Sequence, residues 1–387
     1  MTKQSLRFLA LAAVATLGLA GPAAAQPTVT LPPSGGNQKA TVSQGIGLVR
    51  VTIDYSSPHV KSPAGVDRRG KIWGALVPYG MANLGFGTCG EQCPWRGGAN
   101  ENTVFTTTHD IKVEGQPLPA GSYGLHFIPG PEEWTVIFSK NSTSWGSFTY
   151  NMKEDALRIK AKPAKSEYRE DLTYEFRDRY LDKATAVLRW EDLELPWSIT
   201  VDNAKDLYVE NMQRELRSTA GFSWAGWNSA AQFCLDQKTH LEDGLKWAEL
   251  SVDPSYNGQV SFVTLSTLAD LQAATGHAAE AKKTYDRALN DPSATPIEVH
   301  LYGRKLLAQG RKEEAMAVFE LNARNHPKAW PVHMGLARGH AALGHTRQAL
   351  AEAKLALQQA PDALNRKTIE DMIKQLEEDK GAQSKTK

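Results

Sequence analysis

The sequence predicts an antiparallel β-sandwich or jelly-roll-like domain, followed by a domain built from α-helical hairpins. Three observations lead to this prediction. Apolar residues alternate with a period of about two over residues 45–203, the period becomes about 3.6 after Asn203, and the second half repeats itself every 34 residues. No helical pattern separates the alternating segments, so we expect these strands to pair antiparallel.

The N-terminal residues are predicted to precede the first domain. Lys3 and Arg7 come before an apolar run too short to span a bilayer, and small residues up to Ala25 follow it. This is the pattern of an export signal, so residues 1–25 are predicted to be removed and residues 26–44 to form a flexible segment. We therefore expect a periplasmic or secreted protein. A lone membrane anchor is the alternative interpretation of the apolar run.

The β domain, residues 45–203, is predicted from short alternating segments bounded by Gly, Pro, Asn and Asp. In the segment LTYEFRD, Leu172, Tyr174 and Phe176 point to one face and the residues between them to the other. Such a strand buries one face and exposes the other to water. The predicted strands are residues 47–55, 104–110, 122–129, 134–139, 156–163, 172–178, 185–192 and 195–202.

The helical domain, residues 204–380, carries an internal repeat. Small residues recur where two helices would touch, and proline recurs where a helix pair would end, which resembles the tetratricopeptide pattern. A further hairpin is predicted to start near Trp224, and residues 381–387 are predicted to be a disordered tail. The residues that recur at the 34-residue interval are Gly276, Gly310 and Gly344, then Ala281, Ala315 and Ala349, and finally Pro327 and Pro361.

Charge and hydropathy exclude some classes of partner. The chain has 44 Lys and Arg against 43 Asp and Glu, so it offers no excess of basic charge to attract nucleic acid or an anionic membrane. No apolar stretch after the signal is long enough for a membrane span. Because helical arrays of this kind bind peptides or proteins more often than they catalyse reactions, we expect a protein or peptide partner.

The three cysteines are Cys89, Cys93 and Cys234. Cys89 and Cys93 flank a loop that contains glycine, and exported proteins meet an oxidising environment, so a disulfide between them is predicted. Half of a zinc signature is the alternative interpretation, since two cysteines at this spacing need a second pair. Cys234 lies in a helical segment and is predicted to be a buried free thiol.

The segment CPWRGGANENTVF contains the main candidate binding residues, Trp95, Arg96, Asn100 and Glu101. Arginine is suited to hold an anion, and the glycine pair after Arg96 lets the backbone turn sharply. Two interpretations follow. Arg96 and Glu101 form an internal ion pair that ties down the loop, or they face a small polar pocket in which Arg96 holds an anion and Glu101 acts as a base or a ligand.

Glu101 and His126 are the candidate catalytic residues if the protein is a hydrolase. His126 shares a strand face with Gly124, whose missing side chain leaves room beside the imidazole. If His59, His126 and Glu101 converge, they make a site for zinc or another divalent metal ion. No HExxH, HxH or CxxC spacing supports that site, so no cofactor is predicted and a metal ion stays an alternative.

Motifs in the first half resemble a known family. The segments DYSSPHV, GKIWGALVPYG, WRGGANENTVF, LPAGSYGLHFIP, EWTVIFSK and KEDALRIKAKP occur in order within residues 45–177, and together they closely resemble the exported bacterial family called domain of unknown function 2911. The resemblance implies a β-rich exported domain whose role is not established. The family's Trp-Arg-x-Gly-Ala-Asn-Glu motif corresponds to Trp95–Glu101, whereas the insertion MANLGFGTCGEQCP just before it departs from the family pattern.

We expect an exported binding or scaffold protein, with a small polar pocket in the β domain and a helical domain that binds a partner. A hydrolase is one alternative. A glycan-binding module is another, with Trp145 and Trp95 as the candidate ligand-binding residues, since an indole ring can cover the apolar face of a sugar. Burial in the core is the competing interpretation for most tryptophans of this half.

The export signal and the cysteine pair lead to a first prediction. The mature protein is expected to begin at Gln26 and to contain the Cys89–Cys93 disulfide, which leaves Cys234 as its only thiol. Intact-mass spectrometry, with alkylation before and after reduction, measures the N-terminus and the thiol count together. Three alkylated cysteines in unreduced protein, or a retained leader, would contradict the prediction.

Overall fold

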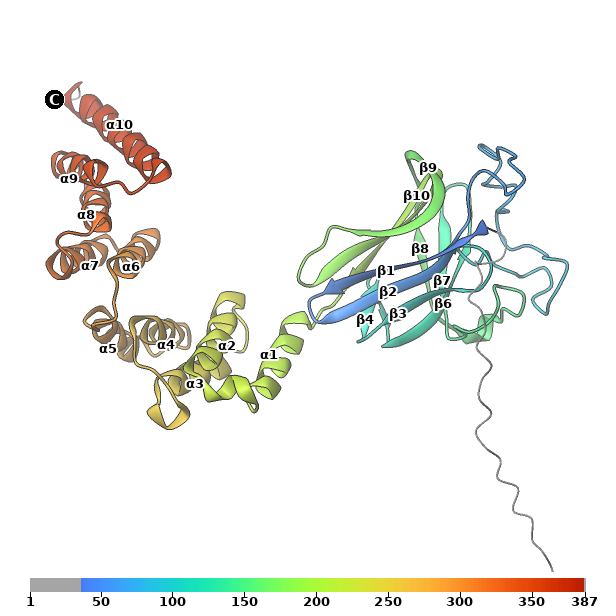
Figure 1. Cartoon of the computed structure of the whole chain (residues 1–387), viewed down its shortest axis with the longest axis horizontal. Coiled ribbons are helices and arrows are strands. Elements are labelled where there is room, and N and C mark those ends of the chain that lie inside the picture. Colours follow the sequence, from blue (N-terminus) through green and yellow to red (C-terminus); the bar gives the residue numbers. More distant parts are fainter. Residues whose placement is uncertain (1–35, 386–387) are drawn as a thin grey trace, which may run out of the picture.

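The structure is a computed structural model that describes residues 36–385. The predicted signal peptide, residues 1–25, lies outside the described residues, as does most of the segment predicted to be flexible, residues 26–44. The last strand ends at Thr200 and the first α-helix begins at Ala204 (Figure 1). This confirms the predicted fold class, a β part followed by an α part.

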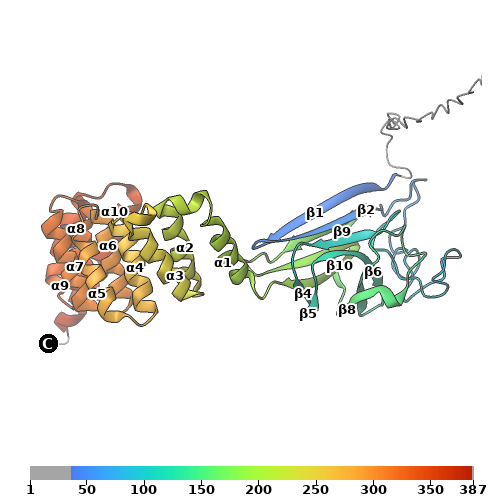
Figure 2. The ribbon, with the colours of Figure 1, turned by 90° about the horizontal axis from the view of Figure 1, so that it is seen from below.

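The β part is a sandwich of two antiparallel sheets (Figure 1, Figure 2). The larger sheet has the strand order β1-β2-β3-β6-β7-β8 and the smaller sheet the order β5-β4-β10-β9. The larger sheet consists of β1 (Gln38–Ile46), β2 (Val49–Ser57), β3 (Thr103–Thr107), β6 (Gly121–Ile128), β7 (Trp134–Ser139) and β8 (Asp155–Ala161). The smaller sheet consists of β4 (Ile111–Val113), β5 (Gln116–Leu118), β9 (Ala164–Arg177) and β10 (Lys183–Thr200).

Alternation along the strands builds the core between the two sheets. On β2, Val49, Val51 and Ile53 are fully buried, whereas the residues between them are exposed or half buried. Trp134 of the larger sheet and Trp197 of the smaller sheet belong to the same buried cluster. Full burial of a large apolar side chain contributes roughly 1.5–3 kcal/mol, so this interface fixes which face of each strand points inward.

One prediction for the β part is wrong at its start. Residues 38–44, predicted to be flexible, belong to β1, which pairs antiparallel with β2 from Gln38 to Ile46. Gly47 takes a φ of 59° and turns the chain back so that Ile46 pairs with Val49. The alternation in this segment is weak because β1 is an edge strand whose residues are mostly exposed or half buried.

A second prediction is wrong at the other end of the sandwich. The two strands predicted at residues 185–192 and 195–202 are one long strand, β10. The pairing of β10 with β9 shifts register on both sides of Glu191, a residue with a φ of 56°. Such a bulge bends a strand without ending it. Because it interrupts the apolar alternation, the sequence pattern predicts two strands where there is one.

The α part contains four helical hairpins within the described residues, preceded by one helix and followed by another. Figure 1 shows the hairpins following one another in an arc that begins beside the sandwich. The pair α2–α3 is the extra hairpin predicted near Trp224. The helices are α1 (Ala204–Glu215), α2 (Trp224–Gln237), α3 (Leu241–Val252), α4 (Phe262–Ala274), α5 (Ala278–Leu289), α6 (Pro296–Ala308), α7 (Lys312–Asn325), α8 (Trp330–Ala342), α9 (Thr346–Gln358) and α10 (Ala363–Lys385).

The glycines that recur at the 34-residue interval, Gly276, Gly310 and Gly344, take positive φ values of 89°, 78° and 77°, and other glycines allow close contacts between helices. Ala315 and Phe319 of α7 are fully buried. An added Cβ at Gly303 of α6 would lie 2.3 Å from the Phe319 ring, and one at Gly335 of α8 would lie 2.6 Å from it. Glycine at these two positions therefore allows α6 and α8 to approach Phe319 closely.

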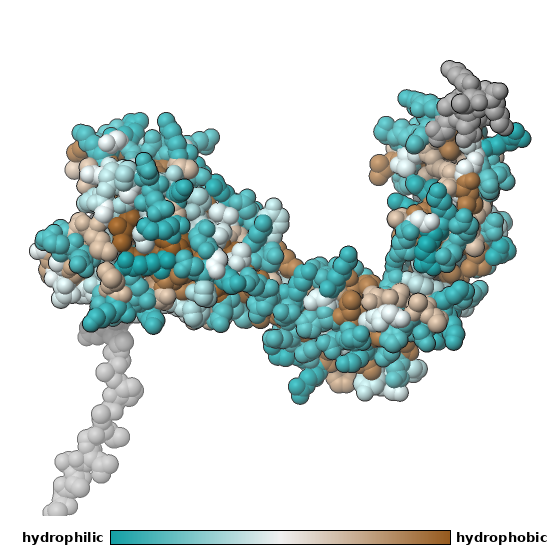
Figure 3. Space-filling view, turned by 180° about the vertical axis from the view of Figure 1, so that it is seen from behind, coloured by the Kyte–Doolittle hydropathy of each residue, from teal (hydrophilic) through white to brown (hydrophobic). Residues whose placement is uncertain are grey.

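The predicted disordered tail, residues 381–387, is wrong over most of its length. Helix α10 continues to Lys385. The segment after Pro361 is rich in Lys, Glu and Gln and contains no further proline, so little opposes continuation of the helix. Within the described residues, none of the helices is long and apolar enough to cross a membrane. Figure 3 shows one face of the molecule as mostly hydrophilic, with apolar patches along the helical arc.

Helix α1 packs on two cores. Ala204 belongs to the core of the sandwich and Leu207 packs against it. Val209 and Leu216 belong instead to the first core of the helical array, together with Trp227. The connection between the two parts therefore runs through α1.

This arrangement leads to a prediction for the separated parts. Fragments 36–208 and 209–387 are each expected to fold, with strand-rich and helical circular dichroism spectra respectively. A fragment that ends at residue 203 should melt at a lower temperature than fragment 36–208, because it loses Ala204 and Leu207 from the sandwich core. Parts that fold only when they are combined would contradict the prediction.

Candidate functional site

The loop that carries the candidate residues enters β3 and lies against both sheets. Trp95 exchanges two main-chain hydrogen bonds with Phe127 of β6, at 2.8 and 2.7 Å. Gly97 takes a φ of 64°, and its carbonyl oxygen accepts a hydrogen bond from the Tyr174 hydroxyl of β9 at 2.7 Å. An added Cβ at Gly97 would lie 2.4 Å from the Phe127 ring and 2.6 Å from that hydroxyl, so only glycine fits.

Arg96 is held by aromatic rings and by the main chain. Its Nη1 donates a hydrogen bond to the carbonyl oxygen of Asn100 at 2.5 Å. Its Cζ lies 4.9 Å from the ring centroid of Phe148 and 5.4 Å from that of Trp145. Burial lowers the pKa of Arg96, because the guanidinium loses water that would stabilise its charge. The faces of two aromatic rings offset part of that loss.

Of the two interpretations of this loop, the internal ion pair between Arg96 and Glu101 does not form in the structure. Glu101 Oε1 lies 3.3 Å from Lys39 Nζ, and Glu101 Oε2 accepts a hydrogen bond from the Ser56 hydroxyl at 3.3 Å. A main-chain hydrogen bond, together with Lys39 and Ser56, lowers the pKa of Glu101, whose side chain is 46% exposed. Lys39 comes from β1, the strand that the sequence pattern did not reveal, and it takes the place expected for Arg96.

His126 is buried in the β part, at 2% exposure. Its Nδ1 lies 3.1 Å from the Ser147 hydroxyl, and its ring packs against Tyr150 with 5.5 Å between centroids. Burial, with a smaller contribution from the charge of Arg96, lowers the pKa of His126 to about 4. The imidazole is therefore neutral at pH 7.

The space expected beside His126 is filled. An added Cβ at Gly124 would lie 2.5 Å from the carbonyl oxygen of Asn141 and 3.2 Å from His126 Nε2. Gly124 thus allows a close approach of the backbone and leaves no opening for a substrate. Since Glu101 is half exposed while His126 is in the core, the hydrolase hypothesis has no common site for these two residues.

The structure does not assemble the proposed metal ligands. His59 Nδ1 contacts the Asp171 carboxylate, and its Nε2 lies 3.2 Å from the carbonyl oxygen of Gly36. His126 faces Ser147, and Glu101 faces Lys39. Among the described residues, no group of three or more His, Cys, Asp or Glu is arranged to hold a metal ion.

The two candidate tryptophans already contact other side chains. The Trp145 ring stacks on Phe148, with centroids 5.8 Å apart and planes 10° apart, and the Arg96 guanidinium lies over it. The Trp95 ring stacks on Trp190, with centroids 6.2 Å apart and planes 13° apart. Trp145 is still 59% exposed, so these contacts leave part of its ring open to solvent, and the glycan hypothesis stays a prediction.

Trp95, Arg96 and Asn100 line one cavity of about 420 Å³ at this end of the sandwich. Glu101 and Trp145, the other two predicted ligand-binding residues, are not among the residues that line it. The cavity is mainly apolar, so it is less polar than the sequence suggested. Its apolar lining includes Pro58, Pro63, Leu76, Val77, Pro78 and Trp190.

The insertion before the motif forms one wall of this cavity. Cys89 and Cys93 are joined by a disulfide, which confirms that prediction, and Cys234 is a buried free cysteine. Ala82 and Cys93 exchange two main-chain hydrogen bonds, at 3.1 and 3.2 Å. Both residues line the cavity, as does Leu84 between them. The disulfide-closed loop is thereby fixed beside Trp95.

Sequence reasoning missed Arg68 and Trp190 as cavity residues. Arg68 donates hydrogen bonds from Nε to the carbonyl oxygen of Val60 at 2.9 Å and from Nη2 to that of His59 at 2.7 Å. Nothing in the segment AGVDRRG distinguished Arg68 from the neighbouring Arg69. Nothing in its neighbourhood distinguished Trp190 from the other core tryptophans.

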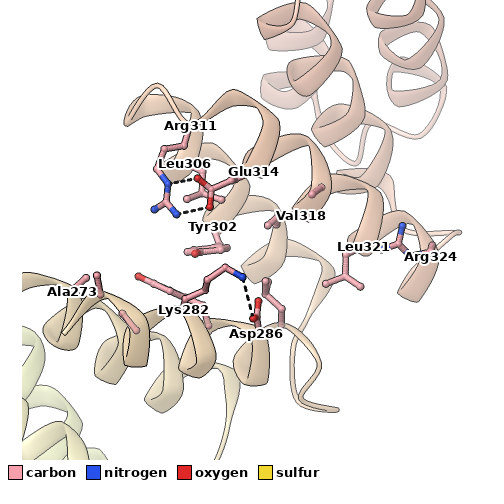
Figure 4. A pocket seen from close by; sticks show the side chains of 15 residues that line it. Ala273, Lys282, Asp286, Tyr302, Leu306, Arg311, Glu314, Val318, Leu321 and Arg324 are labelled. Carbon is pink, nitrogen blue, oxygen red and sulfur yellow. Dashed lines mark hydrogen bonds and ion pairs between the residues drawn. The ribbon is translucent and has the colours of Figure 1, made fainter.

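A second hollow lies in the helical array, between α5 and α7, with a volume of about 620 Å³ (Figure 4). Tyr285 of α5 stacks on Tyr302 of α6, with centroids 4.6 Å apart. Asp270 of α4 accepts hydrogen bonds from the Tyr285 hydroxyl and from Lys305 of α6. These contacts join the two hairpins, while α5 and α7 border an open groove.

Comparisons with known proteins give a family for the β part alone. Residues 37–199 match the family described as "Protein of unknown function (DUF2911)", which confirms the family resemblance for the β part. No curated protein matches the chain. Solved structures match the helical part only weakly: MamA AMB-1 is 15% identical, with 41% of this chain and 82% of that chain covered and a TM-score of 0.29.

Two other matches have titles that name tetratricopeptide proteins. YrrB, titled "a TPR protein with an unusual peptide-binding site", is 13% identical, with 44% of this chain and 84% of that chain covered and a TM-score of 0.29. A thermophilic TPR protein from Thermus thermophilus is 17% identical, with 44% of this chain and 91% of that chain covered and a TM-score of 0.31.

The buried imidazole leads to a prediction about pH. The unfolded chain takes up a proton at His126 near pH 6.5, whereas the folded chain does so only near pH 4. Stability from this residue is thus complete above about pH 6.5 and is lost as the pH falls towards 4, by about 3 kcal/mol in all. Denaturant unfolding from pH 7 to 4 measures the loss.

The comparison variant for this experiment is His126→Gln, whose stability should depend less on pH over the same range. Burial also lowers the pKa of His300 to about 4. Both proteins keep His300, so it contributes the same pH dependence of stability to each. Identical slopes for the two proteins would show that His126 does not titrate as expected.

Proposed function

We propose that this protein, whose β part matches a family of unknown function, is an exported binding scaffold. Its helical array holds a segment of a partner protein, and its β part holds a small ligand in the cavity beside Arg96. Export is supported by the N-terminal signal pattern and by the disulfide. The observation that carries the proposal is the groove between α5 and α7.

The lining of this groove has the pattern of a helix-binding surface. On α5, Ala281, Tyr285 and Leu289 line it at intervals of four residues, and on α7 Val318 and Leu321 do so. Apolar side chains at this spacing form a ridge along each helix, and a third helix fits between two such ridges. An amphipathic helix is thus the partner segment that matches the groove.

The length of the groove limits the size of the helix. It runs along α5, which has 12 residues and is therefore about 18 Å long. A partner helix of about three turns fills that length and would place its apolar side chains against Tyr285 and Leu289. The partner helix would thus pack side by side with α5 and with α7, which border the groove and do not pack on each other.

Charges at the rim favour an acidic partner helix. Lys282 pairs with Asp286 at 3.7 Å and Arg311 with Glu314 at 2.6 Å, so these four side chains are neutralised in pairs (Figure 4). Arg324 also lines the groove, and its guanidinium has no carboxylate partner among the described residues. A carboxylate on the partner helix is expected to lie beside Arg324, although one exposed ion pair contributes only about 0–1 kcal/mol.

Ala317 provides the variant that tests the groove. It is exposed and lines the groove on α7, so Ala317→Arg should block the groove without disturbing the fold. The matched control is Ala351→Arg, since Ala351 is exposed at the equivalent position 34 residues later and does not line the groove. Helical peptides selected from a displayed library on the wild-type protein are the probes, and fluorescence anisotropy measures their binding.

Peptide binding is expected to be at least about tenfold weaker in Ala317→Arg and unchanged in Ala351→Arg, because only the first substitution fills the apolar groove. The peptides enriched should carry apolar residues at helical spacing and net negative charge. Enriched peptides that bind both variants equally, or a library that yields no binder, would contradict the helical part of the proposal.

A further inference from the structure

The cavity beside Arg96 combines cationic and apolar groups and contains no acidic side chain among its described lining residues. Arg68 and Arg96 supply its two cations, and Asn37 and Asn100 supply amide groups. Most other lining residues are apolar.

Both arginines are anchored by main-chain carbonyl oxygens. Arg68 donates to Val60 and His59, and Arg96 donates to Asn100. A carbonyl oxygen orients a guanidinium but does not neutralise its positive charge. Each guanidinium also has more N–H donors than these hydrogen bonds use, and they can bind an anion.

Some other arginines in the chain, unlike these two, are paired with carboxylates. Arg69, next to Arg68, contacts Asp67 at 2.8 Å, and Arg158 contacts Asp155 at 2.6 Å. Among the described residues, neither Arg68 nor Arg96 has a carboxylate within 4.0 Å. Arg96 is also partly buried, packed under Gly146 and against Phe148. A buried cation without an anionic partner is costly, and a bound anion would remove that cost.

Aromatic rings form part of the wall. Trp190 lines the cavity and is 1% exposed. Trp95 stacks on it and presents a second indole to the same space. The guanidinium donors thus lie beside aromatic and proline surfaces, which suit an organic group better than a hydrated inorganic ion.

We propose that this cavity binds a small organic anion, a carboxylate attached to an apolar or aromatic body, with the carboxylate between Arg68 and Arg96 and the body against Trp95 and Trp190. The inference rests on the ligand-binding role proposed for the β part and names its ligand class. Guanidinium groups bind carboxylates in a bidentate manner, which fixes the orientation of such a ligand.

Two probes of the same shape test the ligand class. 2-Naphthoate carries a carboxylate, whereas 2-naphthamide has the same aromatic body without the charge. Isothermal titration calorimetry with the full mature protein is expected to show binding of 2-naphthoate at least about tenfold tighter than that of 2-naphthamide, because hydrogen bonds to a charged group exceed neutral ones by at least that factor.

Arginine variants locate the binding site. Arg68→Gln and Arg96→Gln are each expected to weaken 2-naphthoate binding at least about tenfold and to leave 2-naphthamide binding unchanged. Arg69→Gln is the matched control, since Arg69 is the neighbouring residue, is paired with Asp67 and does not line the cavity. Melting temperatures and near-ultraviolet circular dichroism show whether each variant is folded. If Arg96→Gln does not fold, Arg68→Gln alone decides.

The outcomes separate the inference from the proposal on which it rests. If both probes bind equally and compete with each other, the β part has a ligand cavity, but the proposal that its ligand is an anion is overturned. The same conclusion follows if 2-naphthoate binding is unaffected in folded Arg68→Gln. If neither probe binds, both the ligand class and the ligand-binding role of the β part are overturned.

Discussion

The close approach of the backbone at Gly97 to both sheets is the constraint on which the rest of the β part depends. On one side, Gly97 lies against the Phe127 ring of the larger sheet, and on the other against the Tyr174 hydroxyl of the smaller sheet. No side chain fits between them. The loop is therefore held at the open end of the sandwich, with Trp95 and Arg96 before Gly97 and Asn100 after it. Asn100 takes a φ of 58°, which completes the turn.

This fixed loop explains how the Arg96 guanidinium is held beside aromatic rings. Trp95 is positioned by its hydrogen bonds to Phe127 and stacks on Trp190. Arg96 packs against Phe148 and donates a hydrogen bond to Asn100 in the same loop. Burial of the guanidinium costs free energy that neutral carbonyl oxygens only partly offset. Groups with pKa values shifted by burial are frequent at functional sites, which supports the ligand-binding role proposed for the cavity.

Features that depend on local spacing could be predicted from the sequence, whereas those that depend on distant partners could not. The switch in apolar period and the recurrence of Gly276, Gly310 and Gly344 are local, and both halves of the fold followed from them. The disulfide joins cysteines only four residues apart. By contrast, Glu101 pairs with Lys39, which belongs to an edge strand with a weak pattern, and Arg68 reaches the cavity only through the folded loop. The groove between α5 and α7 could not be predicted from the sequence, because the repeat interval is 34 residues on both sides of it.

The constant 34-residue interval has a consequence for how such arrays evolve. An insertion would change the length of the array and displace every hairpin beyond it, whereas the opening beside Tyr302 is present in a repeat of ordinary length. Opening or closing such a groove therefore requires only exchanges of side chains on facing helices. Related chains can then gain, lose or alter a binding surface by single substitutions, while the curvature of the array stays the same. Sequence divergence among tandem repeats would thus be a direct route to new partner choice.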